Sequence, residues 1–395
     1  MTPVAPTLEP DAASCILWDA VVVGAGCAGA LAAHQLARRG RSVLLVDKAA
    51  FPRWKVCGCC INARAQGALQ LAGLGALLAA HEAVRLDTLR VAARGRFASL
   101  PLPGYSALSR ETLDAGIVNA AVQAGAHFLP RAQATLADVT DSHRIVLLRC
   151  AGKEYRVTAR LVLAADGLGG RLLRGTDAFD SPSTEDSRIG AGAMAVDAPD
   201  AYAPGTIFMA CGTGGYVGLT RVEDGRLDVA AAFDTAFVKD SGSLARAAER
   251  VLLEAGFPPL PSIEDLPWRG TPALTRTASQ LHAHRALVVG DAAGYVEPFT
   301  GEGMAWALTS ALAVAPLADQ AIDQFDASTG HAWEQLYRRT VTRRQFICRA
   351  MAAALRRPAL VQGLVALVSF APRLAAPAIR HVNQLPRPPQ GVQPQ

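Results

Sequence analysis

Three cysteines stand within four positions of the segment "FPRWKVCGCC", residues 51–60, where their spacing could support chemistry. Cys57 and Cys60 have the C-x-x-C spacing of a redox pair, so a thiol/disulfide site is one interpretation. A second interpretation is a set of buried, inert thiols. We predict no metal site, because a structural metal takes about four ligands and this segment offers at most three, with no histidine beside them.

A second pattern with chemical meaning lies at residues 19–48. Gly24, Gly26 and Gly29 have the spacing G-x-G-x-x-G. Such glycines allow a tight turn, a close approach of the backbone to a pyrophosphate, and close packing of the next helix on the sheet. Asp47 follows the last glycine by eighteen residues, where an acid accepts hydrogen bonds from a ribose. These four residues predict a dinucleotide site.

The elements that must position these residues follow from the hydrophobic pattern. Residues 20–23 and 42–46 are short apolar runs typical of buried parallel strands, and residues 28–39 between them predict a helix that Gly40 ends. The helix would direct its N-terminal N–H groups and the positive end of its dipole at the phosphates. Strand, glycines, helix, strand and acid therefore occur in the order that a nucleotide-binding unit needs.

A third apolar run, residues 286–289, predicts a strand that ends just before Asp291. An acid at a strand end can bind sugar-like hydroxyls. The turn at residues 300–303 leads into a helix from about Gly303, and it contains Gly301 and Glu302. Backbone N–H groups of this turn can face a developing negative charge, such as that on a reduced flavin ring.

Three segments resemble the cofactor motifs of glutathione-reductase-type flavoproteins, a group that includes geranylgeranyl reductases, aromatic hydroxylases and flavin halogenases. "SRETLD" at residues 109–114 is similar to the S-R-x-x-L-D segment of this group, which implies that Arg110 lies along FAD. "AADG" at residues 164–167 resembles the A-D-G motif and implies that Asp166 and Gly167 lie near the flavin and pyrophosphate. The segment 283–322 resembles the second FAD motif. A structural salt bridge for Arg110 and a simple turn at Asp166 are the alternatives.

The loop at residues 51–60 resembles the P-R-x-K-x-C-G-G loop of geranylgeranyl reductases. It matches at five positions, Pro52, Arg53, Lys55, Cys57 and Gly58. It departs at Cys59, where the family often has glycine. The resemblance implies that Cys57 contacts the flavin ring or the substrate and that Arg53 or Lys55 meets phosphate.

We therefore predict an α/β protein, with a Rossmann-like FAD-binding domain, an interleaved antiparallel-sheet substrate domain and C-terminal helices. The FAD-binding parts are placed at residues 17–90, 109–180 and 276–325, and the substrate sheet at residues 91–108 and 181–275. Residues 326–395 are assigned to C-terminal helices and a Pro/Gln-rich tail. No second G-x-G-x-x-G follows a strand, so NAD(P)H is expected to bind transiently, or an electron-donor protein to replace it.

Composition limits the protein's class and location. The 395 residues are 51% hydrophobic and 18% charged, which is typical of a globular chain. The eight cysteines are scattered outside the segment 51–60, which favours a reducing cytoplasm. The first nineteen residues have no Lys or Arg, so we expect a loose tail rather than a secretory signal. We expect no stretch of the roughly 20 apolar residues that span a bilayer.

Positive charge is concentrated at the C-terminal end. After Asp326 there are ten arginines, no lysine and one acid, Glu334, or about +9, against +5 for the whole chain. A solvated helical face is one interpretation, and attraction to anionic lipid or to a pyrophosphate group is another. The apolar residues 358–372 predict a helix packed on the protein, with a membrane-surface helix as the alternative. Nucleic acid is disfavoured, because few aromatics and no binding motif accompany these arginines.

The first functional hypothesis is hydride transfer from reduced FAD to a double bond of a lipophilic isoprenoid or polyketide. Cys57, or a water held near Glu302, would deliver the proton. The alternative is a monooxygenase of secondary metabolism that hydroxylates an aromatic or polyketide ring. Hydroxylases tend to have histidine after G-D-A-A, where this chain has Gly294, which favours the reductase. A Cys57–Cys60 disulfide oxidoreductase and a simple electron carrier are further alternatives.

Overall fold

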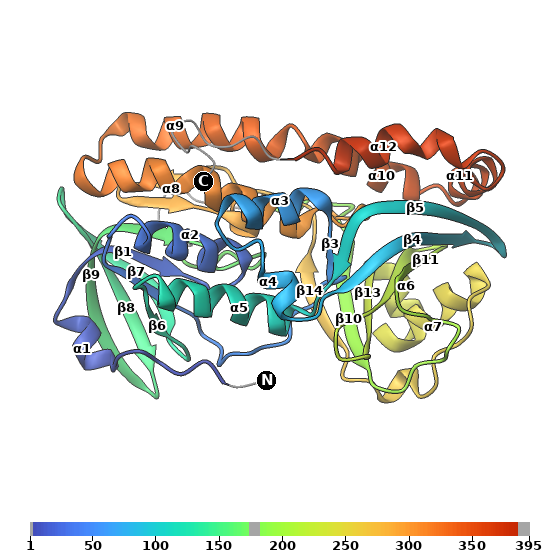
Figure 1. Cartoon of the computed structure of the whole chain (residues 1–395), viewed down its shortest axis with the longest axis horizontal. Coiled ribbons are helices and arrows are strands. Elements are labelled where there is room, and N and C mark those ends of the chain that lie inside the picture. The colour runs from blue at the N-terminus through green and yellow to red at the C-terminus, as the bar shows by residue number, and fades with distance from the viewer. Residues whose placement is uncertain (1–2, 174–181, 386–395) are drawn as a thin grey trace.

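The strands of residues 3–173 and 182–385, which the computed structural model describes, form two eight-stranded sheets and a two-stranded ribbon (Figure 1). The first sheet has the order β16-β17-β9-β1-β2-β6, and β8 joins it beside β9 and carries β7. Its strands are β1 (Leu17–Val23), β2 (Val43–Val46), β6 (His127–Leu129), β7 (Gln133–Val139), β8 (Arg144–Cys150), β9 (Lys153–Ala164), β16 (His282–Ala283) and β17 (Ala286–Val288). The α/β class is confirmed.

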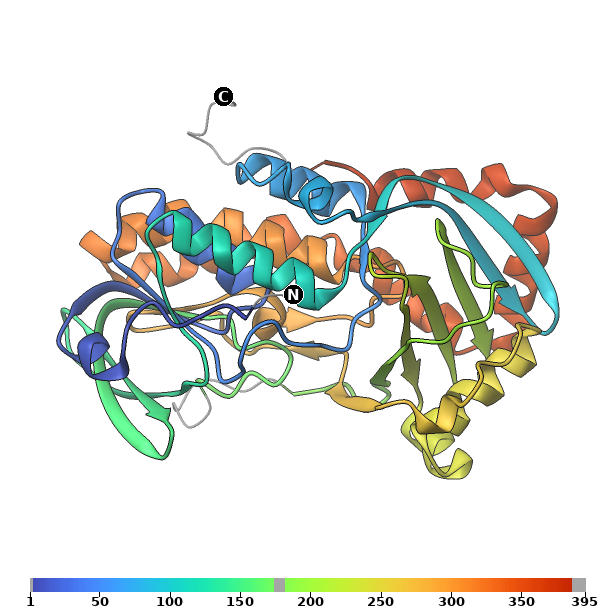
Figure 2. The same ribbon diagram turned by 60° about the horizontal axis from the view of Figure 1, so that its bottom comes forward.

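The centre of the first sheet is parallel, since β17, β9, β1, β2 and β6 pair in parallel register. The helix α2 (Cys27–Ala37) connects the parallel strands β1 and β2 and forms the predicted strand–helix–strand unit of a nucleotide-binding fold. The helices α5 (Arg110–Gln123) and α8 (Gly303–Asp323) pack on α2 along one face of the sheet (Figure 2). Every residue of β2 is buried, as expected for a strand covered on both faces.

The second sheet has the order β14-β10-β13-β12-β11-β4-β5-β3. Its strands are β3 (Cys60–Ile61), β4 (Val84–Ala93), β5 (Arg96–Ala107), β10 (Ile189–Ala195), β11 (Thr206–Gly212), β12 (Gly215–Arg221), β13 (Leu227–Phe233) and β14 (Arg269–Ala273). All neighbours are antiparallel except β11 and β4, which are parallel. The helix α7 (Leu244–Ala255) packs on β11 and β12.

The two sheets exchange segments along the chain, as the predicted interleaving requires. The predicted boundary between residues 90 and 91 falls inside β4, all of which belongs to the second sheet, so this boundary lies nearer residue 83. The two residues of β3 also pair with the second sheet. The predicted boundary at residues 180 and 181 lies outside the described residues, as do residues 386–395 of the predicted tail.

Short elements complete the fold. The helices are α1 (Pro10–Ser14), α3 (Ala63–Leu71), α4 (Leu77–Ala80) and α6 (Thr235–Ser241), with 3₁₀ turns η1 (Ile263–Asp265) and η2 (Gly290–Ala293). The ribbon pairs β15 (Arg276–Thr277) with β18 (Gly294–Tyr295). The expected loose N-terminal tail is wrong, because the backbone N–H groups of Val4 and Thr7 donate to carbonyls of Phe51 and Phe128 at 3.1 and 3.0 Å.

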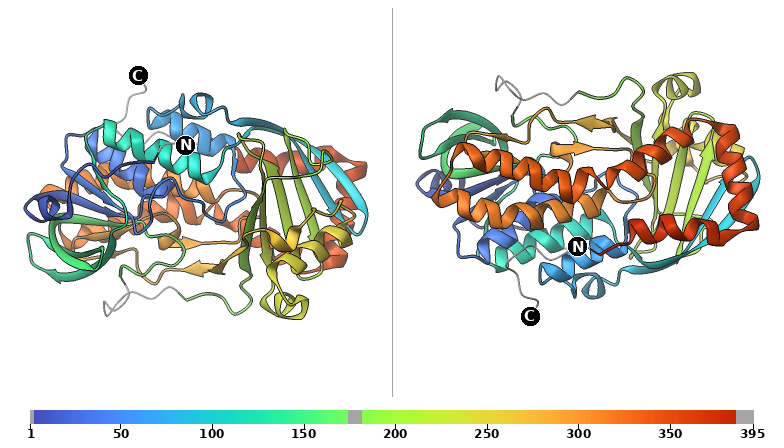
Figure 3. Two further views of the ribbon diagram at one scale, coloured as in Figure 1. Left: turned by 90° about the horizontal axis from the view of Figure 1, so that it is seen from below. Right: turned by 90° about the horizontal axis from the view of Figure 1, so that it is seen from above.

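The C-terminal helices cross over both sheets (Figure 3). They are α9 (Ala327–Tyr337), the π-helical turn η3 (Arg338–Thr342), α10 (Gln345–Leu355), α11 (Pro358–Phe370), the 3₁₀ turn η4 (Pro372–Ala375) and α12 (Ala376–Val382). Within the described part of the chain, α8 alone is long and apolar enough to cross a bilayer. The expectation that no stretch is apolar enough to span a bilayer is therefore wrong for residues 303–323, but 78% of the apolar window of α8 is buried inside the protein. It is therefore placed as a core helix.

Candidate active site

Two of the three glycines at the turn from β1 into α2, Gly24 and Gly29, leave no room for a side chain. Gly24 has a φ of +101°, and a Cβ there would lie 2.3 Å from the carbonyl oxygen of Ala165. A Cβ on Gly29 would lie 1.8 Å from the carbonyl oxygen of Gly24. A Cβ on Gly26 would point at the guanidinium groups of Arg110 and Arg53, 3.5 and 3.6 Å away. The backbone at the N-terminus of α2 is therefore open to an anionic ligand, with two arginines beside it.

Asp47 lies at the end of β2, as predicted, and it organises this loop. Its Oδ2 accepts a hydrogen bond from the backbone N–H of Ala25 at 2.8 Å, and its Oδ1 accepts one from Ala49 at 2.9 Å. Arg53 Nη2 lies 3.6 Å from the same carboxylate. Carboxylate oxygens have further lone pairs, so Asp47 can also accept from a ribose hydroxyl.

Arg110 and Asp114 form a buried ion pair one helical turn apart on α5. Arg110 Nε and Nη2 donate to the two Asp114 oxygens at 3.0 and 2.7 Å. Arg53 Nη1 lies 3.2 Å from Asp114 Oδ2. Burial raises the pKa of Asp114, but Arg110 and Arg53 outweigh this, so the pKa lies below its usual value. The salt-bridge alternative for Arg110 therefore holds, and Arg110 also lines the cavity that these residues share.

Asp114 was not among the predicted site residues. The sequence did contain a signal for this ion pair. Asp114 is the last residue of the S-R-x-x-L-D match, and it follows Arg110 by four residues, the spacing of an ion pair on one face of a helix. With one carboxylate it holds two guanidinium groups against the glycine-rich loop.

Asp166 and Gly167 lie in a turn after β9, opposite the glycine-rich loop. The Asp166 Oδ2 accepts hydrogen bonds from the N–H groups of Arg171 and Leu172 at 2.6 and 3.0 Å. Gly167 has a φ of +81°, which favours glycine. The turn interpretation of Asp166 therefore holds, while both residues also line the cavity.

The loop at residues 51–60 is tied to the segment that precedes α8. Lys55 Nζ lies 3.4 Å from Asp291 Oδ2. Gly301 has a φ of +72°, and a Cβ there would lie 3.9 Å from the Cβ of Cys60. Gly303 is the first residue of α8. The N-terminus of α8 and the cysteine loop therefore face each other, as the sequence motifs imply for residues beside a flavin.

Glu302 lies differently from the prediction. Its side chain is 1% exposed, and its Oε2 accepts hydrogen bonds from Thr300 Oγ1 and Cys348 Sγ, both at 3.1 Å. Burial raises the pKa of this carboxyl group. Glu302 is not among the residues that line the cavity, so the geometry gives no support to the predicted water-mediated proton delivery. The carboxyl group instead connects the start of α8 to α10.

The three loop cysteines are separate thiols with different surroundings. All eight cysteines are free, so the structure holds no Cys57–Cys60 disulfide. Cys57 is partly exposed, whereas Cys59 is 1% exposed and has a φ of +53°. Cys60 Sγ donates to the Gly58 carbonyl at 2.9 Å. Such a left-handed backbone conformation favours glycine, so cysteine is an uncommon residue at this position.

Cys57 is the acidic thiol of the three. The hydrogen bond of the Cys59 side chain, helped by the positive charge of Arg110, lowers the pKa of Cys57 to about 6 against the opposing effect of burial. Burial raises the pKa of Cys60 to about 12. Of the three loop thiols, Cys57 alone has a lowered pKa, because the pKa values of Cys59 and Cys60 are both raised.

Asp228 on β13 is a buried acid that the sequence analysis missed. It is 1% exposed, and burial raises its pKa well above the usual range, with the Cys57 charge acting in the same direction. The signal was an acid between apolar residues in "RLDVAAAF". An acid whose charged form is disfavoured by burial therefore lies behind the cysteine loop.

A cavity of about 1420 Å³ joins these residues. Its lining runs from the glycine-rich loop to residues of the second sheet and of the C-terminal helices, which enclose a chamber. The predicted residues on its wall are Gly24, Gly26, Asp47, Arg53, Cys57, Arg110, Asp166, Gly167, Asp291, Gly301 and Gly303. The chamber end is apolar and includes Leu89, Val91, Leu102, Ile207, Met351, Val361 and Val365. Gly29 lies outside the lining, where it packs α2 on the loop.

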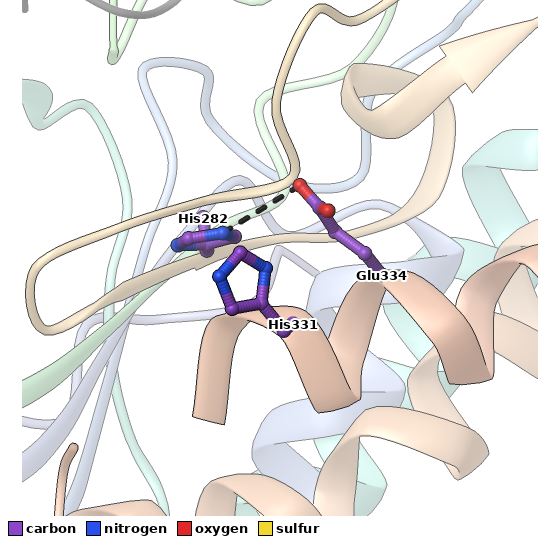
Figure 4. Close-up of side chains that lie close together, drawn as sticks. All are labelled: His282, His331 and Glu334. Atoms are coloured by element: carbon purple, nitrogen blue, oxygen red, sulfur yellow. Dashed lines mark ion pairs between the residues drawn. The ribbon is translucent and has the colours of Figure 1, made fainter. Parts of the chain in front are cut away.

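A separate cluster joins α9 to the edge of the first sheet. Figure 4 shows His331 and Glu334 on α9 beside His282 on β16. Nε2 of His282 lies 3.6 Å from Oε1 of Glu334, and one ligand atom from each residue lies within 4.8 Å of the others. None of the three lines the cavity. The cluster pins α9 to β16, outside the chemistry described above.

The glycine cradle, the two arginines beside it and the acid at the end of β2 fit the pyrophosphate and ribose of a dinucleotide. The family model described as FAD binding domain matches residues 18–319, which include all of these elements. The chain belongs to this FAD-binding family. It is an FAD-dependent oxidoreductase, and the residues that would hold FAD are those of the cavity's polar end.

Two kinds of curated relative are similar to this FAD-binding chain. A menaquinone reductase of Mycobacterium tuberculosis (strain H37Rv) is 41% identical over 156 residues. That match spans 38% of this chain and only 37% of the relative's length. Digeranylgeranylglycerophospholipid reductase 1 of Methanopyrus kandleri is 29% identical over 344 residues, 82% of this chain and 88% of the relative.

Solved structures share the fold. A geranylgeranyl bacteriochlorophyll reductase-like protein from Thermoplasma acidophilum has a TM-score of 0.74 at 20% identity, over 93% of this chain and 95% of that one. A p-nitrophenol 4-monooxygenase from Pseudomonas putida has a TM-score of 0.72 at 15% identity, over 93% of this chain and 98% of that one. At these identities the likeness is one of fold alone.

Proposed function

We propose that the protein is a reductase that saturates a carbon–carbon double bond of a lipophilic, isoprenoid-type molecule. The observation that carries this proposal is the shape of the cavity, whose polar end suits FAD and whose far end is an apolar chamber. The names of the relatives support the substrate class, because menaquinone and digeranylgeranylglycerophospholipid both carry isoprenoid chains.

The polar end has a defined task for each group. The N-terminus of α2, with Arg53 and Arg110 beside it, would bind the pyrophosphate, and Asp47 would bind the ribose. The N-terminus of α8 would face the flavin ring. When bound and reduced, FAD supplies a hydride, which is two electrons and one hydrogen nucleus.

Cys57 is proposed as the acid that completes the reduction. A hydride reaches one carbon of the double bond, and the Cys57 thiol gives its proton to the other carbon, so that the product gains two hydrogen atoms. The thiolate that remains is stabilised by Cys59 and Arg110 and regains a proton from water. A thiol pKa of about 6 suits proton transfer near neutral pH. NAD(P)H, or a donor protein, is proposed to reduce the FAD again.

An anaerobic turnover experiment tests the reaction type. The purified yellow protein is reduced with dithionite without oxygen and mixed with a geranylgeranyl lipid in detergent. We expect the visible flavin absorbance to return and the product to gain two hydrogen atoms by mass spectrometry. Product that forms only with oxygen would overturn the proposal in favour of a monooxygenase.

A pair of cysteine variants tests the acid. Cys57→Ser removes the acidic thiol, and we expect turnover to fall by about 10²-fold, the size of a typical acid–base contribution. Cys150→Ser changes a buried thiol on β8 that does not line the cavity, and it should keep full turnover. Equal turnover in both variants contradicts the role of Cys57.

A further inference from the structure

The helix α11 has two apolar faces with different surroundings. Val361 and Val365, one turn apart, are buried and line the cavity. On the other face, Leu360 and Leu367 are 43% and 51% exposed, and Phe370 at the end of the helix is 95% exposed. A helix that only covered the chamber would carry polar residues on its outer face. The outer face of α11 therefore has no explanation in the folding of the chain.

The cavity opens beside this exposed face. Leu364 on α11 and Leu374 in η4 both line the cavity, and they are 38% and 58% exposed. A residue that lines the cavity and is also exposed to solvent lies where the cavity opens to the surface, which we call its mouth. The apolar chamber therefore reaches the surface at α11 and η4.

We name the group Leu360, Leu364, Leu367, Phe370 and Leu374 the α11 strip. Of the twelve large apolar side chains that are exposed in the described part of the chain, seven lie between residues 346 and 385. Such a concentration is not the usual scatter of single apolar residues over a protein surface. In Figure 3 the helices that carry it form one end of the molecule.

The charge around the strip is positive. Arg357 and Arg373, both exposed, stand at the two ends of α11, and Arg349 and Arg380 are exposed on α10 and α12. No Asp or Glu follows Glu334 in the sequence. Apolar side chains framed by arginines, without acids, complement the acyl and headgroup layers of an anionic membrane.

The bend between α10 and α11 fits shallow insertion rather than a membrane crossing. Together these helices are apolar enough for a span, but they meet at 111°. One face of the pair is also occupied by the cavity. Only the outer face is therefore free to enter a bilayer.

We propose that the α11 strip docks the protein on an anionic lipid surface, and that the mouth at Leu364 and Leu374 admits the lipophilic substrate directly from the bilayer. The proposed docking rests only on the exposed α11 strip and on the arginines around it. The delivery of substrate rests on the proposed function as well.

Vesicle flotation tests the docking without any assay of activity. The purified holoprotein is mixed with vesicles of equal parts phosphatidylcholine and phosphatidylglycerol, or of phosphatidylcholine alone. We expect it to float with the anionic vesicles and to be released by high salt. Leu367→Ser/Phe370→Ser should lower vesicle binding by about tenfold or more, because two apolar anchors are lost. Arg357→Gln/Arg373→Gln should remove the preference for anionic vesicles.

Matched controls keep the test decisive. Val196→Ser/Leu253→Ser changes apolar side chains that are 73% and 56% exposed outside the strip, and Arg149→Gln changes an exposed arginine on β8. These variants should bind vesicles as the wild type does. Flavin content and the thermal unfolding midpoint verify that each variant is folded. A wild type that does not float, or a Leu367→Ser/Phe370→Ser variant that floats equally well, overturns the docking.

Substrate delivery is tested by comparing two presentations of the same geranylgeranyl lipid. Leu367→Ser/Phe370→Ser should keep its turnover with detergent-dispersed lipid and lose it with lipid held in anionic vesicles. Equal loss in both presentations overturns delivery through the mouth. Flotation without any turnover of the wild type would sink the proposed function and leave the docking intact.

Discussion

The departure from glycine at Cys59 changes the chemistry of Cys57. Because the Cys59 thiol is the main group that lowers the pKa of Cys57, Cys59→Ala should move this pKa up from about 6, toward the usual thiol value. Cys59→Ser keeps a hydrogen-bond donor and should change the pKa little. The rate of iodoacetamide alkylation as a function of pH measures the pKa, with Cys57→Ser as the blank. A wild-type profile centred near 9 contradicts this prediction.

Asp114 is the residue whose loss should cost the most stability at the cofactor end. Its side chain is fully buried, and a substitution that removes the negative charge leaves Arg110 and Arg53 without the carboxylate that they share. Asp114→Asn should lower the free energy of unfolding by about 3–5 kcal/mol, the usual result of breaking a buried pair. Urea unfolding measures it. Asp323→Asn, at the exposed pair with Arg41, is the control and should change stability little.

The contribution of Asp114 to the free energy of unfolding should depend on pH in a definite direction. The pKa of Asp114 is lowered in the folded state, so its contribution is present at neutral pH and is lost as the pH falls below 3.8. The stability difference between wild type and Asp114→Asn should therefore shrink in that acid range. A difference that stays constant there would mean that the effect of Asn is one of packing alone.

At the scale of elements, the crossover from β1 through α2 to β2 depends on the close approach of the backbone at Gly29 to the carbonyl group of Gly24. A Cβ at Gly29 would lie 1.8 Å from the Gly24 carbonyl oxygen, so Gly29→Ala must move α2 away from the loop. We expect the purified variant to lose most of its bound flavin, measured as visible absorbance per protein. Gly363→Ala is the control, because a Cβ there meets nothing within 4 Å, and alanine in a helix stabilises by about 0.5–1 kcal/mol.

This crossover was also the part of the fold that the sequence predicted best. The expected strands at residues 20–23 and 42–46 and the helix at 28–39 differ from β1, α2 and β2 by at most three residues at any end. Their periodicity and glycines are local signals. The predicted helix at residues 358–372 is confirmed as α11, but neither its two apolar faces nor the buried Asp228 was predicted. The reason is that β13 meets the cysteine loop, and α11 meets the second sheet, only through packing between segments far apart in the chain. The hydrogen bond between Glu302 and Cys348 was not predicted for the same reason, since Cys348 comes from α10.

At the scale of the whole molecule, Arg188 holds three parts of the protein together. It is 1% exposed and precedes β10 of the second sheet. Its Nε and Nη1 lie 3.1 Å from Asp234 and from Glu297, and its Nη2 donates to the Leu355 carbonyl at 3.4 Å. Glu297 stands between the ribbon and α8, and Leu355 ends α10. The second sheet, the flavin-side segment and the C-terminal helices thus meet on one guanidinium group.

Arg188→Met should therefore lower the free energy of unfolding and weaken the contacts between the parts of the protein that enclose the chamber. Methionine keeps much of the volume but leaves Glu297 buried without its ion-pair partner, at a cost of about 3–5 kcal/mol in urea unfolding. Burial already raises the pKa of Glu297 despite Arg188, and without Arg188 that pKa rises further. A carboxyl group with a raised folded pKa destabilises the folded state above that pKa, so the loss of stability should be largest in mildly alkaline buffer and smaller in mild acid.

The double variant Arg188→Met/Glu297→Gln should recover part of the stability and lose this pH dependence, because the carboxylate that lost its partner is also removed. Arg226→Met, at a half-buried pair with Glu111, is the matched control and should cost less. A loss that is equal at both pH values would show that Arg188 acts through packing rather than through charge.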